Sequence, residues 1–124
     1  MSSIAGLMAL LQLKREQLNR LNVCQGKLYR SQSSFTENEY LCLEPNLTAV
    51  TWAGSLAEEF DSIRHTEILT NYREVESVQF NHVFMVLNDT IRRIELEIIL
   101  IQQQIAALQE AERRSREAAA RLKK

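Results

Sequence analysis

EPNLTAVTWAGSLAE, residues 44–58, is the stretch that decides the fold of this 124-residue chain. It holds the single proline, Pro45, and one of only three glycines. Proline cannot donate to a helical hydrogen-bond ladder and disfavours helical geometry in the residue before it, so a helix must end by Glu44. Ser55 and Glu58 then match a capping box, in which the serine hydroxyl accepts from the amide of Glu58. The stretch therefore predicts a bend followed by a helix from Ser55.

The chain on both sides of this bend is patterned as helix. Before it, an interrupted apolar stripe follows heptad spacing from Ile4 to Phe35. After it, neither glycine nor proline occurs up to the last residue, so nothing in the sequence stops a second helix. We predict an all-α, single-domain fold over residues 1–124, an antiparallel and coiled-coil-like hairpin. Helix one is expected at about 3–41, the bend at about 44–54 and a much longer helix two at about 55–122.

Helix two carries the cleanest apolar stripe in the sequence. The stripe starts with Leu56, Phe60, Ile63, Ile68, Tyr72 and Val75, and then changes phase. Its later part is an uninterrupted heptad run that we predict to bind a partner: Phe80, Phe84, Leu87, Ile91, Ile94, Ile98, Ile101, Ile105 and Leu108.

The lengths of the two helices suggest why this run needs a partner. At about 1.5 Å per residue, helix one would be roughly 55 Å long and helix two roughly 100 Å. With Tyr40 opposite Ser55, Ile4 is expected near Ile91, and everything past about Ile94 has no partner within the chain. Leaving the last four apolar side chains of the run in water forgoes roughly 6–10 kcal/mol of burial. A helix of another protein, a homodimer or tetramer seam, and an unexpected third helix remain as alternatives for what covers them.

Composition argues against several classes of protein. A formal net charge of −1 does not suit a protein that coats nucleic acid, and Cys24 and Cys42 match neither a disulfide framework nor a metal site. The apolar residues 4–13 lack a basic leader and are too few to span a bilayer, so we expect no membrane insertion. His65 and His82 are isolated, and no phosphate-binding glycine loop or activated nucleophile is recognisable. We therefore predict neither an enzyme nor a cofactor or metal.

A Trp-x-Gly motif, Trp52-Ala53-Gly54, lies at the bend between the two helices. In this setting the chain resembles the WXG-like helical hairpins of bacterial type VII (ESX) secretion, and more narrowly the YwqH-like small proteins encoded beside LXG-domain toxins. The resemblance runs through residues 41–45, 52–57 and 59–61 and continues to Ile68 and Tyr72. The hairpin motif it marks consists of Trp52, Gly54, Ser55, Glu58 and Phe60. We interpret Trp52 as a plug for the open end of the hairpin rather than as a recognition residue.

The resemblance implies an accessory adaptor or targeting chaperone, which binds the helical LXG domain of a toxin and promotes its export. It implies the type VII machinery as a further partner and leaves room for a second small helical accessory protein. It also implies a Gram-positive source, and a cytoplasmic protein or one co-secreted with the toxin. Export signals of the family have the form Tyr-x-x-x-Asp/Glu, which Tyr72 with Glu76 and Tyr40 with Glu44 match. The alternative function is a self-associating coiled-coil structural protein, a homodimer or tetramer with no toxin partner.

Overall fold

The structure is a computed structural model that describes residues 3–46 and 54–123. Over these residues the chain is an all-α helical hairpin without strands, as predicted, with helical segments of 40 and 68 residues. The first segment consists of α1 (Ile4–Glu37) and a short 3-10 turn, η1 (Glu39–Leu43). The second begins at Ser55 and ends at Leu122, also as predicted.

The second segment contains two π-helical turns. Its elements are α2 (Ser55–Ile63), η2 (Arg64–Ile68), α3 (Leu69–Glu74), η3 (Val75–Gln79) and α4 (Phe80–Leu122), where η2 and η3 are the π turns. A π turn closes its hydrogen bonds from residue i to i+5. Each falls on a five-residue step of the apolar pattern, Ile63 to Ile68 and Val75 to Phe80, which explains the change of phase seen in the sequence. The helix continues through Asn88 without a break.

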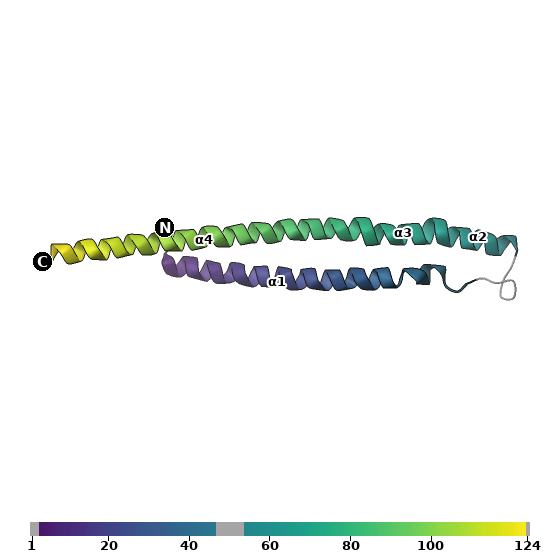
Figure 1. Cartoon of the computed structure of the whole chain (residues 1–124), viewed down its shortest axis with the longest axis horizontal. Helices are drawn as coiled ribbons and strands as arrows, with labels where there is room; N and C mark the ends of the chain where they lie inside the picture. The colour runs from purple at the N-terminus through teal and green to yellow at the C-terminus, as the bar shows by residue number, and fades with distance from the viewer. Residues whose placement is uncertain (1–2, 47–53, 124) are drawn as a thin grey trace. The chain divides into compact units, whose positions relative to one another are not determined.

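Two compact units make up the chain, and each is described by itself. Unit 1 combines Met1–Val23 with Asn88–Lys124, and unit 2 is Cys24–Leu87. In unit 1, the first turns of α1 (purple in Figure 1) lie beside α4 (green), and the two run antiparallel. Leu7, Ile101 and Ile105 form its buried cluster, and Ile4, Leu11 and Leu108 pack around it.

This cluster shows that the predicted pairing of the two helices was wrong. Leu7 is buried with Ile101 and Ile105, whereas the prediction placed Ile4 near Ile91. A salt bridge of 2.7 Å between Lys14 Nζ and Glu97 Oε2 agrees with this alignment, because Lys14 follows Leu7 on α1 and Glu97 precedes Ile101 on the antiparallel α4. The apolar run past Ile94 therefore has a partner within the chain.

Contacts in unit 2 explain why the alignment of the first helical segment with the second differs from the predicted one. We expected Tyr40 opposite Ser55, as a tight bend would require. Instead, Arg64 Nη1 donates a 2.8 Å hydrogen bond to the Pro45 carbonyl. The chain leaving η1 thus lies beside a residue well inside the second helical segment, and an ion pair between Glu39 and Arg73 continues this alignment.

The start of α2 also differs in detail from the predicted capping box. Gly54 occupies the N-cap position with φ 102°, a backbone conformation that suits glycine, and makes no side-chain cap. The amide of Glu58 donates to the Gly54 carbonyl at 3.1 Å. Ser55 is the first helical residue rather than the cap, so the predicted capping box of Ser55 and Glu58 does not form.

The first four members of the early apolar stripe of the second segment do not face the core. These members, Leu56, Phe60, Ile63 and Ile68, are all exposed, at 67%, 41%, 40% and 46% of their surface. The buried positions in this part are Ala57, Arg64 and Leu69, each one residue after a member of the predicted stripe. A shift of one residue turns a helix by about 100°, which places a different face against the first segment.

Candidate protein-binding surfaces

The predicted hairpin motif at the bend is only partly described. Trp52 lies outside the described residues. Gly54, Ser55 and Glu58 are exposed around the start of α2, and their contacts set the beginning of the helix. Phe60 is 41% exposed, and the Arg64 guanidinium lies 5.0 Å from its ring centroid. The motif residues seen here have structural roles.

Arg64, which lies in η2 and contacts Pro45 at the bend, was not recognised from the sequence. Only 3% of its surface is exposed, and besides Pro45 it pairs with the Asp61 carboxylate and lies over the ring of Phe60. Buried arginines need such partners, because an isolated buried charge is costly. Asp61 and Phe60 stand three and four residues before Arg64, a spacing that puts them on one helical face. That spacing was the available signal, although the contact with Pro45 depends on the tertiary fold.

The predicted partner-binding run is mostly core in this structure. Seven of its members are no more than 9% exposed: Phe84, Leu87, Ile91, Ile94, Ile98, Ile101 and Ile105. The other two, Phe80 and Leu108, are half-buried. The seven buried side chains offer no free surface to a partner. The predicted overhang of helix two without a partner in the chain is therefore not present along this run. Their burial stabilises the fold instead.

Tyr72 and Glu76, the candidate export signal, are both engaged within unit 2. The Tyr72 ring stacks on Phe35 at 3.8 Å between centroids, and its hydroxyl donates to the Phe35 carbonyl. Glu76 Oε1 accepts from Thr36 at 2.9 Å, and its carbonyl accepts from Gln32 at 3.1 Å. Desolvation, followed by the nearby Cys42 and carboxylates, raises the pKa of Tyr72. A structural role explains both residues, and export recognition stays a prediction.

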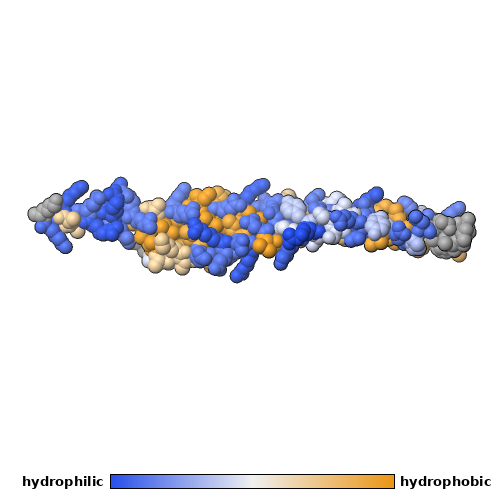
Figure 2. Space-filling view, turned by 60° about the horizontal axis from the view of Figure 1, so that its bottom comes forward, coloured by the Kyte–Doolittle hydropathy of each residue, from blue (hydrophilic) through white to orange (hydrophobic). Residues whose placement is uncertain are grey.

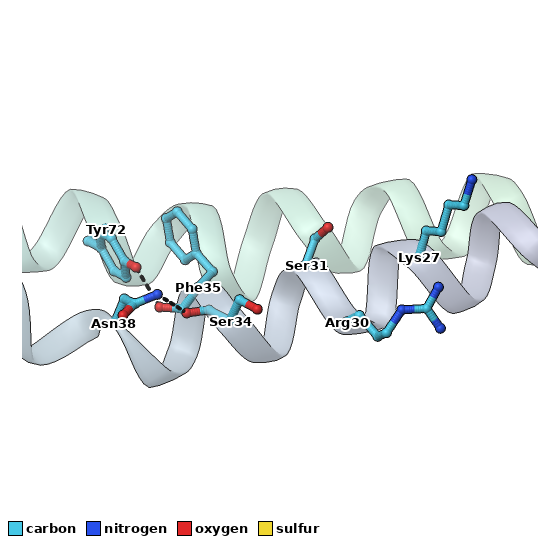
Figure 3. Close-up of a pocket in the computed structure, with 7 residues that line it drawn as sticks. All are labelled: Lys27, Arg30, Ser31, Ser34, Phe35, Asn38 and Tyr72. Atoms are coloured by element: carbon cyan, nitrogen blue, oxygen red, sulfur yellow. Dashed lines mark hydrogen bonds between the residues drawn. The ribbon is translucent and has the colours of Figure 1, made fainter.

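A shallow pocket of about 650 Å³ lies in unit 2 beside this stack. It is lined by Lys27, Arg30, Ser31, Ser34, Phe35, Asn38 and Tyr72. Figure 3 shows the charged ends of Lys27 and Arg30 at one end of the pocket and the stacked rings at the other. Asn38 Nδ2 donates to the Ser34 carbonyl at 2.8 Å. The polar groups do not converge on one point, which a reacting substrate would require.

The exposed apolar surface of unit 1 is better suited to a partner. Leu10, Leu100 and Ile101 line a groove of about 350 Å³ together with Lys14, Glu97 and Gln104, and we call it the leucine groove. Leu10 and Leu100 are 39% and 57% exposed. Figure 2 shows hydrophobic surface gathered over this part of the molecule. Leu13, 48% exposed, follows Leu10 by three residues and lies next to it on the surface of α1, outside the lining of the groove.

The leucine groove has one defined polar feature. Lys14 and Glu97, whose side chains are 24% and 35% exposed, pair across it at 2.7 Å. The hydrogen bond from Lys14 holds the pKa of the Glu97 carboxyl below its ordinary value. A partly exposed ion pair adds little stability but gives a groove an orientation, because an incoming side chain meets opposite charges at fixed places.

The described residues hold neither a cluster suited to a metal ion nor a helix suited to crossing a membrane. Over 3–46 and 54–123, no three or more His, Cys, Asp or Glu side chains come together in a way that could hold a metal ion. Among the same residues, no helix is both long and apolar enough to cross a membrane. Cys24 is exposed, Cys42 is half-buried, and both are free thiols.

The fold and these surfaces define an all-α helical hairpin with an apolar groove between its two helical segments in unit 1. Comparisons with protein-family models, with curated proteins and with solved structures each found no match to this chain. The resemblance to WXG-like hairpins therefore rests on the residues of the sequence alone.

Proposed function

We propose that this chain is an adaptor that binds a helix of another protein in the leucine groove of unit 1. In line with the family resemblance, the proposed partner is the helical LXG region of a type VII secretion toxin. The chain would then act as a targeting chaperone that accompanies the toxin to export. The observation that carries the proposal is the exposure of Leu10 and Leu100 in one groove, with the exposed Leu13 beside Leu10 on α1.

The groove fits an amphipathic helix in both chemistry and geometry. A helix laid along two others completes a three-helix bundle and buries its own apolar face against both. Leu10, Leu13 and Leu100 are about half exposed, so covering them would contribute roughly 1 kcal/mol each. The partner's own apolar side chains would add a comparable amount. Lys14 and Glu97 would select a helix whose charges complement theirs.

Co-purification with the LXG region of a neighbouring toxin tests the proposal. The variant Leu10→Glu with Leu13→Glu should keep its helical circular dichroism, because both side chains face solvent, and should lose the toxin region. Met8→Glu is the matched control, since Met8 is 50% exposed on the same helix but does not line the groove. Equal recovery of the toxin with both proteins would rule out the groove as its binding site.

A further inference from the structure

A row of mostly exposed residues lies on α4 in unit 1, apart from the buried isoleucines of that helix. Its members are exposed or, for Glu110, half-exposed, and follow heptad spacing with alternating steps of four and three residues: Asp89, Arg93, Leu96, Leu100, Gln103, Ala107, Glu110 and Arg114. We call this row the outer seam. Leu96 stands two residues before the buried Ile98, about 200° around the helix, so the outer seam points away from the core.

The outer seam is apolar in its middle and charged at both ends. Leu96 and Leu100 are 61% and 57% exposed and stand one turn apart on a single helix face. At the ends, the side chains of Arg93 and Arg114 are 70% and 75% exposed, and that of Asp89 is 69% exposed, and each forms an ion pair along its own helix, with Glu97, Glu110 and Arg92 respectively. A seam of this kind matches one side of a coiled-coil contact, where apolar centres exclude water and outer charges set the alignment.

The order of the charged residues along the outer seam suits a second copy of the same helix. If a second copy of α4 lies antiparallel, with its centre between residues 101 and 102, Asp89 of one copy faces Arg114 of the other. Arg93 then faces Glu110, and the leucines meet Ala107 and Gln103. Twofold symmetry repeats every pair. Parallel copies in register would instead set each charge against its own kind, which is unfavourable.

We propose that two copies of this chain associate through the outer seam of α4, antiparallel and in the register that pairs Asp89 with Arg114. A second copy of the chain is complementary to the seam, because an antiparallel copy sets its acidic residues opposite basic ones and its basic residues opposite acidic ones. The outer seam shares Leu100 with the leucine groove and has no other residue in common with it. Self-association is measured without any toxin, so the outcome is independent of the adaptor proposal.

Sedimentation velocity of the purified full-length chain over a range of concentrations tests the dimer. We expect a reversible monomer–dimer equilibrium, which Asp89→Arg weakens at least tenfold by setting two arginines face to face at each end. Combining Asp89→Arg with Arg114→Asp should restore the dimer, because it inverts the charge order at both positions. Glu112→Arg is the control, with the same change of charge at an exposed residue outside the seam.

Several results would overturn this interface. A monomer at every concentration would rule out self-association. A dimer as strong in the Asp89→Arg variant as in the unmodified chain would place the contact elsewhere. If the double variant stayed as weak as Asp89→Arg alone, the register that pairs residues 89 and 114 would be wrong. Circular dichroism of each variant checks that the helices are intact, as the exposure of the Asp89 side chain predicts.

Discussion

Leu7 of α1 and Ile101 of α4 lie in the same buried cluster of unit 1, with only 4% and 6% of their surfaces exposed. This contact decides which apolar residues are core and which are available to a partner. It places the isoleucine run of α4 in the core and leaves the leucines at its sides exposed. The functional surface therefore has to be sought beside that run rather than on it.

The burial of Leu7 predicts a large loss of stability on truncation. Leu7→Ala removes a nearly fully buried side chain from the cluster, and such changes destabilise by about 2–5 kcal/mol. Urea unfolding followed by circular dichroism should show the loss. Met8→Ala, at the next position with half its surface exposed, should change the free energy of unfolding by less than about 0.5 kcal/mol. Similar effects of the two variants would contradict the pairing seen in unit 1.

Arg64 should hold the bend through the Pro45 carbonyl. Arg64→Ala removes this hydrogen bond and the pair with Asp61, at an expected cost of about 1–3 kcal/mol. Amide hydrogen exchange should become faster at Leu41, in η1, and at Glu44, directly after it. Arg73→Ala is the comparison, because this arginine is 63% exposed and its pair with Glu39 is worth less than about 1 kcal/mol. Equal exchange rates in the unmodified chain and the Arg64 variant would show that the contact does not hold the bend.

The Lys14–Glu97 pair should make stability depend on pH in the acid range. The hydrogen bond from Lys14 lowers the pKa of Glu97 in the folded state, so the pair stabilises the fold above the ordinary glutamate value of 4.5. That contribution should disappear as the pH falls through the lowered folded pKa. Carboxyl NMR titration of Glu97 should show the lowered value, and Lys14→Met should return it toward 4.5. An unchanged titration in this variant would show that Lys14 is not the cause.

Tyr72 should ionise only at unusually high pH. Burial of its ring against Phe35 disfavours the charged phenolate and raises its pKa above 10.0. The stabilising effect is therefore present below pH 10 and is lost as the pH rises through the folded pKa. Spectrophotometric titration of the unmodified chain minus that of Tyr72→Phe isolates this group. A midpoint at or below 10.0 would contradict the packing described for unit 2.

The sequence was sufficient for the helices and their ends, because these depend on local chemistry. Pro45 and Gly54 mark the bend, and the absence of both residue types after Ser55 predicts the length of the second segment. The five-residue steps of the apolar pattern also correspond to the two π turns. Local rules of this kind need no knowledge of what each helix packs against.

The pairing of the helices could not be predicted in the same way. It depends on tertiary contacts, such as the hydrogen bond from Arg64 to the Pro45 carbonyl, which join residues far apart in the sequence. The heptad run of α4 was correctly recognised as a surface that must be covered, but its cover was assigned to another molecule. The leucine groove was missed because Leu10 and Leu100 belong to different helices and become neighbours only through the fold.

An NMR titration of the isotope-labelled chain with the helical LXG region of a type VII toxin, the partner we propose, tests the central claim most directly. We predict that the largest chemical-shift changes fall on Leu10, Leu13, Leu100 and Gln104, around the leucine groove. Changes confined to residues 24–87, or no change at all with the toxin region in excess, would contradict the account.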